Sequence, residues 1–193
     1  GGRAGWGSTP CAYIGIAGAN DGISIGHIGI GSRGTELDEI ALRLKQSHKV
    51  EMTAVCDLWS VNREKAAATN AAFYGKAPRT FKDPAELLAA GDLDAVIIST
   101  PEHSHSPLLK LAAEAGKDIY VEKPMGNVLS EVKAGRDAVL QRKIIAQVGT
   151  QHRSEPYPNM ARETIQSGSV GDARKTQHGW NYQGPRWTGR EEV

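Results

Sequence analysis

The sequence is short of cysteine, of long apolar runs and of a charge surplus of either sign. Its 193 residues include only two cysteines, Cys11 and Cys56, whose spacing gives neither a disulfide framework nor a CxxC metal pair. The 23 basic and 22 acidic residues nearly cancel, so no basic field marks nucleic acid or a membrane surface as a partner. No run approaches the roughly 18 apolar residues of a membrane-spanning helix. We therefore expect no nucleic-acid or membrane partner.

The length of the chain allows one domain with a sizeable core, or one domain and part of a second. Residues 1–22 are rich in Gly, Ala and Ser and contain a short apolar patch at residues 12–19. This leader fits either the remnant of an export signal or a flexible extension. A cytoplasmic and a periplasmic location both stay open.

From residue 23 onward, short β-rich runs alternate with helical patterns. The expected strands cover residues 23–30, 50–56, 95–100, 118–121 and 144–148, and the expected helices cover residues 35–47, 61–72, 84–90, 106–115 and 129–142. This alternation predicts βαβ units and a parallel sheet. The run at residues 95–98 is continuously apolar, which suits a strand covered on both faces. We predict an α/β fold, a doubly wound parallel sheet of the Rossmann type, over residues 23–150.

After Val148 the pattern changes. Residues 151–158 are polar and contain two prolines, residues 159–167 have a helical pattern, and residues 172–182 fit a strand. We interpret residues 151–193 as the incomplete start of a second α/β domain that would hold a substrate.

The stretch Gly29-Ile30-Gly31-Ser32-Arg33-Gly34 is the most informative part of the chain. It directly follows the apolar, β-branched run at residues 23–28 and precedes a helical pattern. Asp57 ends the next apolar run, 23 residues after Gly34, close to the roughly 20 residues expected. A strand, a glycine turn, a helix, a strand and a carboxylate in this order predict a dinucleotide-binding site.

Each part of this motif has a physical role. Gly29 permits the tight turn, Gly31 lets a pyrophosphate approach the backbone, and Gly34 lets the helix pack closely on the strand. Ser32 and Arg33 belong to the same loop, at a helix N-terminus whose N–H groups attract phosphate. Asp57 would accept hydrogen bonds from ribose hydroxyls, which favours NAD over NADP because a 2′-phosphate would meet a carboxylate.

Further motifs come after the expected strands, where a doubly wound sheet binds its ligands. They are STPEHSH at residues 99–105, EKP at residues 122–124 and QVGTQHR at residues 147–153. Lys123 is the sharpest catalytic candidate, since its ammonium could hydrogen-bond a substrate hydroxyl, stabilise the alkoxide as a hydride leaves, and relay the proton. The alternative is a surface lysine paired with Glu122. His103 and His105 alternate on one short loop, and we expect them to contact nicotinamide or substrate rather than metal, because no third ligand is nearby in the sequence. The alternative is hydrogen bonding at a helix start.

Taken together, these residues resemble the Gfo/Idh/MocA oxidoreductases. The resemblance covers residues 23–187, and its specific part is AGKDIYVEKP at residues 115–124. It implies an N-terminal NAD(P)-binding domain, a C-terminal α/β domain with an open sheet, and oxidation or reduction of a sugar, cyclitol or related polyol. Carried over to this chain, it implies pyrophosphate at Gly29, Gly31 and Gly34, ribose at Asp57, the reacting centre at Lys123, and the nicotinamide side at Thr100, Pro101, His103 and Glu122.

The sequence departs from the family at one functional point. Family enzymes carry a catalytic histidine in the second domain, usually in an Asp-x-x-x-His pattern, and no such pattern occurs here. Three hypotheses remain: an NAD(P)-dependent sugar or polyol oxidoreductase present as cofactor domain plus stub, an NAD-dependent glycosidase of the same fold suggested by Arg33, or a non-catalytic dinucleotide-binding module. We expect a homo-oligomer where the full second domain is present. The substrate itself is not specified by the sequence.

Overall fold

The computed structural model describes residues 22–172, 174–175, 177 and 179. Most of the expected leader and most of the expected strand at residues 172–182 lie outside the described residues. The chain divides into two compact units between Thr150 and Gln151, and each is described by itself.

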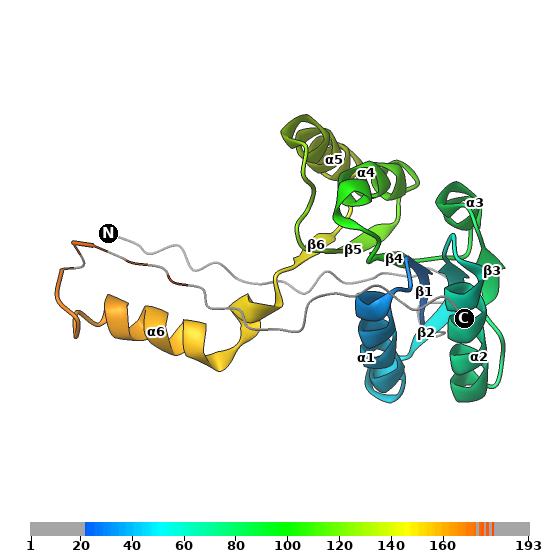
Figure 1. Ribbon diagram of the computed structural model, residues 1–193, viewed down its shortest axis with the longest axis horizontal. Coiled ribbons are helices and arrows are strands. Elements are labelled where there is room, and N and C mark those ends of the chain that lie inside the picture. Colours follow the sequence, from blue (N-terminus) through cyan, green and yellow to red (C-terminus); the bar gives the residue numbers. More distant parts are fainter. Residues whose placement is uncertain (1–21, 173, 176, 178, 180–193) are drawn as a thin grey trace, which may run out of the picture. The chain divides into compact units, whose positions relative to one another are not determined.

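The first unit alternates strands with helices (Figure 1). Its strands are β1 (Ile23–Ile28), β2 (Val50–Cys56), β3 (Arg79–Phe81), β4 (Ala95–Ile98), β5 (Asp118–Glu122) and β6 (Ala146–Gly149). Its α-helices are α1 (Ser32–His48), α2 (Ser60–Tyr74), α3 (Pro84–Ala89), α4 (His105–Glu114) and α5 (Leu129–Arg142), and a 3-10 turn, η1 (Glu102–Ser104), precedes α4.

All six strands are parallel, in the order β3-β2-β1-β4-β5-β6. This is the strand order of a doubly wound Rossmann sheet, with the order reversing between β1 and β4. Helices α1 and α2 cover one face, and α3, α4 and α5 cover the other (Figure 1). The predicted fold class is confirmed.

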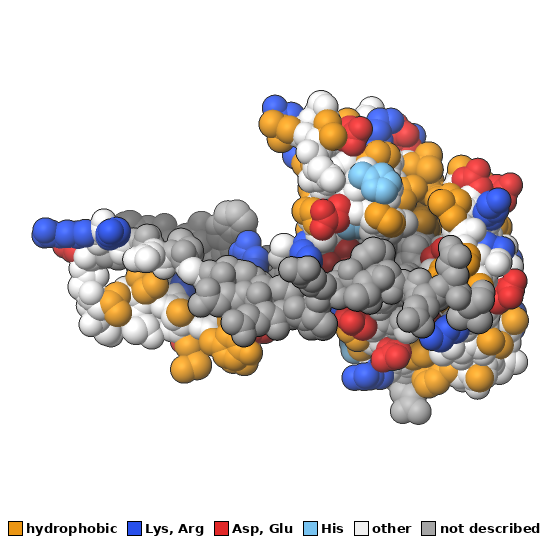
Figure 2. All heavy atoms as spheres, viewed as in Figure 1, with side chains coloured by type: hydrophobic (Ala, Val, Ile, Leu, Met, Phe, Trp, Pro, Cys, Tyr) orange, Lys and Arg blue, Asp and Glu red, His pale blue; other side chains and the backbone are white. Residues whose placement is uncertain are grey.

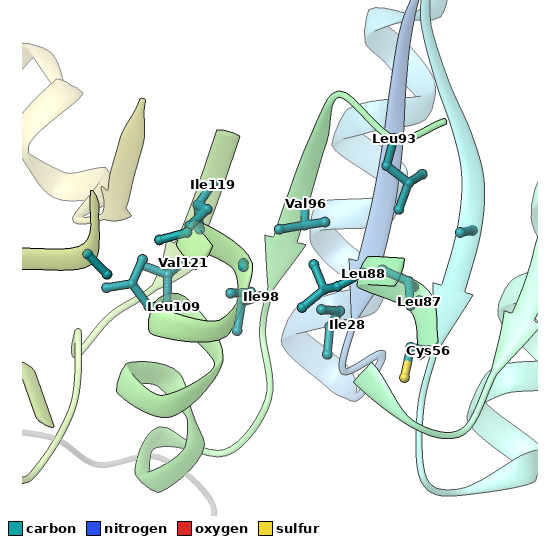
Figure 3. Close-up of a cluster of buried hydrophobic side chains, with 14 residues drawn as sticks. Ile28, Cys56, Leu87, Leu88, Leu93, Val96, Ile98, Leu109, Ile119 and Val121 are labelled. Atoms are coloured by element: carbon teal, nitrogen blue, oxygen red, sulfur yellow. The ribbon is translucent and has the colours of Figure 1, made fainter. Parts of the chain in front are cut away.

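The core has one layer on each face of the sheet. On the side of α3, α4 and α5, Ile98, Val121 and Leu109 are at most 1% exposed, and their side chains meet between β4, β5 and α4 (Figure 3). On the opposite side, Met52 and Val55 pack with small residues of α1 and α2. Burial on both faces explains the continuous apolar run in β4.

Several boundaries differ from the expectation. Strand β3 was not expected, because it is a three-residue edge strand whose two exposed residues give no apolar pattern. Helix α1 begins at Ser32, three residues earlier than expected, so the last residues of the glycine motif form its first turn. Strand β1 ends at Ile28, and β6 covers Ala146–Gly149 rather than residues 144–148.

The second unit contains a 3-10 turn, η2 (Gln151–Ser154), and helix α6 (Pro156–Gln166). The helix starts three residues before its expected position, at the first of its two prolines. Proline is tolerated there because first-turn N–H groups have no partner within a helix.

Surface charge and helix length are the structural features relevant to nucleic-acid and membrane partners. On the face of the first unit seen in Figure 2, acidic and basic side chains are interspersed, in line with the nearly balanced composition. Within the described part of the chain, every helix is too short or too polar to cross a membrane.

Candidate functional site

The glycine turn between β1 and α1 is shaped by two close approaches. Gly29 has φ +86°, and a Cβ there would lie 2.6 Å from Cγ2 of Thr100. A Cβ on Gly34 would overlap the carbonyl oxygen of Gly29. Both positions therefore require glycine for the chain to pack, Gly29 also for its backbone conformation.

Gly31 differs from these two glycines, because a Cβ there would meet no atom within 4 Å. It precedes α1, and the helix begins with a hydrogen bond from the N–H of Thr35 to the Gly31 carbonyl. The N–H groups of Ser32, Arg33 and Gly34 consequently have no partner within the helix. An open space in front of a helix N-terminus fits a phosphate group.

A cavity of about 670 Å³ lies at the carboxyl ends of β1, β2 and β4. This volume is typical of cofactor and small-molecule sites, and the position is the one at which doubly wound sheets bind ligands. Eight of the predicted site residues line it: Gly29, Gly31, Ser32, Arg33, Asp57, Thr100, Pro101 and His103. Gly34, Glu122 and Lys123 are not among its lining residues.

Asp57 stands directly after β2 and lies against the glycine turn. Its Oδ2 accepts a hydrogen bond from the N–H of Ile30 at 2.7 Å, and its Oδ1 accepts one from the N–H of Trp59 at 2.8 Å. Asn62 donates to Oδ2 at 3.3 Å. A carboxylate has about four lone-pair positions, so these three donors leave capacity for a hydroxyl group in the cavity.

Arg33 connects the glycine turn to the end of β5. Its Nε lies 2.8 Å from Oε1 of Glu122, and its Nη1 lies 2.6 Å from Oε2 of Glu36. The hydrogen bond to Glu122 is the main cause that raises the pKa of Arg33. Glu122 is 3% exposed and also accepts hydrogen bonds from the N–H of Lys123 and from the hydroxyl of Tyr120. Burial raises the pKa of that hydroxyl.

Lys123 is exposed and immediately follows β5, with a cis peptide bond to Pro124. The carboxylate of Glu122 is bound to Arg33 and to the backbone of Lys123. In the described part of the chain, the ammonium of Lys123 takes part in no ion pair. The structure therefore does not form the surface pair between Lys123 and Glu122 that the sequence left open.

The two histidines of the STPEHSH loop have different environments. His103 is exposed and lines the cavity. His105 is 1% exposed, with Nδ1 2.6 Å from the carbonyl oxygen of Pro124 and Nε2 2.7 Å from that of Thr100. His105 thus joins the loop after β4 to the loop that carries Lys123. Among the described residues no group of His, Cys, Asp and Glu could hold a metal ion.

Sequence reasoning missed two groups at this site. Ser99 lines the cavity and donates to the carbonyl of Gly29, and His27 lies buried beneath the turn. The only signal for His27 in the sequence was a histidine inside an apolar strand. His105 was expected to contact nicotinamide or substrate, but its ring is buried with both nitrogens beside carbonyl oxygens. The residues of QHR at 151–153 belong to the second unit.

Comparisons with known proteins agree with this geometry. Residues 23–150 match the sequence model of the Gfo/Idh/MocA family, described as "Oxidoreductase family, NAD-binding Rossmann fold". The chain is 41% identical over 90 residues to scyllo-inositol 2-dehydrogenase (NAD(+)) of Bacillus subtilis, covering 47% of this chain and 26% of that protein. It is 37% identical over 121 residues to inositol 2-dehydrogenase of Rhizobium meliloti, covering 63% and 34%.

A solved structure with the same fold is scyllo-inositol dehydrogenase from Lactobacillus casei with bound NAD(H) and scyllo-inositol. The TM-score is 0.70 at 22% identity, over 78% of this chain and 43% of that one. The chain spans about a quarter to a third of the length of the curated relatives named above. The family match, over residues 23–150, lies within the first unit.

Proposed function

This chain belongs to the Gfo/Idh/MocA oxidoreductase family. We propose that it is the nucleotide-binding part of an NAD-dependent oxidoreductase that acts on a sugar or polyol, with a cyclitol as the leading candidate substrate. The observation that carries the proposal is the open space at Gly31, in front of the first turn of α1 and beside Asp57. The inositol dehydrogenases among its relatives support the substrate class.

The residues of the cavity fit a dinucleotide. The N–H groups at the start of α1, with Gly29 and Gly31, would hold the pyrophosphate, while Gly34 lets the helix approach the turn. Asp57 would bind the adenosine ribose and disfavour a 2′-phosphate. Ser32 and Arg33 would lie at the phosphate end, and Thr100, Pro101 and His103 would line the nicotinamide end. Glu122 would act through Arg33, which it binds.

Oxidation of an alcohol removes a hydride from carbon and a proton from oxygen, and bound NAD would supply the hydride acceptor. Lys123 would hold the substrate oxygen by a hydrogen bond, stabilise the developing alkoxide charge and relay the released proton to solvent. His103 would contact the nicotinamide or the substrate from the loop after β4. Lys123 follows the buried Glu122 directly, so the ion pair with Arg33 fixes the backbone from which its side chain extends.

The test combines binding with turnover. Calorimetric titration of the 193-residue chain with NAD and NADP should show binding, with NAD preferred. In a protein that carries this unit with a complete substrate domain, free inositols should give continuous release of NADH. Release of nitrophenol from a nitrophenyl glycoside without net NADH would indicate the glycosidase instead. NAD binding with neither activity would indicate a non-catalytic module, and no binding of either dinucleotide would refute the proposal.

A further inference from the structure

A cluster of buried polar side chains lies beneath the glycine turn. His27 of β1, Asp38 of α1 and Asn70 of α2 are 0%, 4% and 0% exposed. They come from three different elements of the core face that otherwise contains Ile30, Met52 and Val55. Buried polar groups are costly unless they are paired, so such a cluster in an apolar layer calls for a physical explanation.

These side chains form a chain of contacts that ends at the turn. Asn70 Nδ2 donates to Asp38 Oδ2 at 2.7 Å, and Asp38 Oδ1 lies 3.5 Å from His27 Nδ1. His27 Nε2 is 2.8 Å from Ser99 Oγ, and Ser99 Oγ donates to the carbonyl oxygen of Gly29 at 2.6 Å. We call these four side chains the buried relay.

The direction of the protons in the buried relay is set by its last member. A carbonyl oxygen only accepts hydrogen bonds, so Ser99 donates its hydroxyl hydrogen to the carbonyl oxygen of Gly29. The oxygen of Ser99 must then accept from His27, which places a proton on Nε2. Nδ1 of His27 consequently faces Asp38 Oδ1. Neither of these two buried atoms has a hydrogen-bond partner, and each is the other's neighbour.

The buried relay acts on a single peptide group. The carbonyl of Gly29 is held by Ser99, and the N–H of the same peptide, which belongs to Ile30, is held by Asp57 at 2.7 Å. This peptide is fixed at both ends, and it immediately precedes Gly31. Its orientation determines where the following N–H groups point.

We propose that His27, Asp38 and Asn70 are positioning residues for the dinucleotide, which act through Ser99 on the Gly29–Ile30 peptide. The proposal rests on the proposed function for the placement of the pyrophosphate at this turn. None of the three residues is among those that line the cavity. Any effect of these side chains on affinity is therefore indirect, and the buried relay connects them to the turn.

The first test compares two substitutions of similar size at Asp38. Asp38→Leu removes every polar atom from this point of the buried relay, and it should weaken NAD binding to the 193-residue chain about tenfold, the equivalent of one hydrogen bond. Asp38→Asn should keep most of the affinity, since its amide oxygen can accept from Asn70 while its N–H donates to His27. Asp92→Asn, at an exposed pair with Arg79, is the control and should bind as the parent does.

A double-mutant cycle tests whether Asp38 acts on the glycine turn through Ser99. Ser99→Ala already disconnects the turn from His27, so adding Asp38→Leu to Ser99→Ala should cost little further affinity. Losses that add in full would show that Asp38 acts by another path and would overturn the proposal. Equal affinity of Asp38→Leu and the parent would overturn it as well.

The proton positions can be measured without any dinucleotide. Long-range ¹H–¹⁵N correlation spectra of the free chain, assigned with His27→Gln, should show Nε2 of His27 carrying a proton. An unprotonated Nε2 would mean that Ser99 donates to the ring rather than to Gly29, which overturns the relay. If Nε2 is protonated and the parent chain binds no NAD, the proposed function has failed rather than the proton order of the relay.

Discussion

Arg33 and Glu122 are 89 residues apart in the sequence, yet Nε of Arg33 lies 2.8 Å from Oε1 of Glu122. One residue belongs to the first turn of α1, and the other ends β5 immediately before Lys123. The pair therefore connects the backbone that would bind phosphate to the backbone that would carry the reacting side chain. It also removes Glu122 as a partner for the ammonium of Lys123.

Replacing Arg33 should destabilise the fold, because it leaves the buried carboxylate of Glu122 without its charged partner. Arg33→Met strands the carboxylate of Glu122, which is 3% exposed, and should lower the free energy of unfolding by about 1–3 kcal/mol. Urea denaturation measures this. Arg136→Met, at an exposed pair with Asp137, is the control and should change stability by less than about 0.5 kcal/mol. Recovery of stability in Arg33→Met/Glu122→Leu would support the explanation, because the stranded charge is then gone.

The glycines of the turn should respond differently to the same added methyl group. Gly31→Ala meets no atom within 4 Å, at φ −74°, so stability should change by less than about 0.5 kcal/mol. NAD affinity should fall about tenfold or more, since the methyl group enters the space assigned to pyrophosphate.

Gly34→Ala is the matched comparison. Its Cβ would overlap the carbonyl oxygen of Gly29, so this variant should lose about 1–3 kcal/mol of stability. Thermal unfolding and calorimetric titration of the two variants separate these effects. Unchanged NAD affinity in Gly31→Ala would contradict the assignment of the open space.

Much of the fold could be predicted because its signals are local. Alternating β-rich and helical runs specify a parallel sheet, and the turn from Gly29 to Gly34 specifies a helix directly after the first strand. Strand β3 could not be found in this way, since its pairing with β2 rather than its three residues makes it a strand. The start of α1 was predicted too late because Gly34 is typical of a turn. In the structure Gly34 belongs to the first turn of α1, where the absence of a side chain lets it pack on Gly29.

The same distinction between local signals and contacts formed only in the folded chain applies to the candidate site. The positions of Asp57 and Thr100 after strands were predictable from sequence order, because parallel strands place their carboxyl ends at one edge. The partners of these residues were not. That Glu122 binds Arg33, and that His27 lies between Asp38 and Ser99, depends on side chains brought together only by the folded sheet.

Asp57 should have two measurable roles. Asp57→Ala should weaken NAD binding and relax the preference against NADP, because the carboxylate that would accept from the ribose is lost. It should also release the N–H of Ile30, which Asp57 holds at 2.7 Å. Asp57→Asn keeps an oxygen for that N–H, so it should lose selectivity with less loss of NAD affinity. Equal NAD affinity in Asp57→Ala and the parent would contradict the assignment.

Cys56 should make stability fall at alkaline pH. Burial, followed by the nearby Asp57, raises the pKa of its thiol from 9.0 to about 12. The folded chain therefore keeps the proton that the unfolded chain releases, so the stabilisation is complete below pH 9 and is lost as the pH rises toward 12. The loss should approach about 1.4 kcal/mol per pH unit. Urea denaturation of the parent and of Cys56→Ser measures the difference, and parallel curves between about pH 8 and about pH 11 would contradict the shift.

Lys123 should affect turnover far more than cofactor binding. It lies outside the residues that line the cavity, and its ammonium takes part in no ion pair among the described residues, so Lys123→Ala should leave NAD affinity and stability nearly unchanged. In the full-length protein kcat should fall about 10²- to 10⁴-fold, the range expected when a group that stabilises charge or transfers a proton is lost. Lys110→Ala, at an exposed pair with Glu114 on α4, is the control and should keep its kcat. Unchanged turnover in Lys123→Ala would remove this residue from the reaction. A parallel loss of NAD affinity and kcat would instead make Lys123 a cofactor-binding residue, because a purely catalytic group acts on the bound complex.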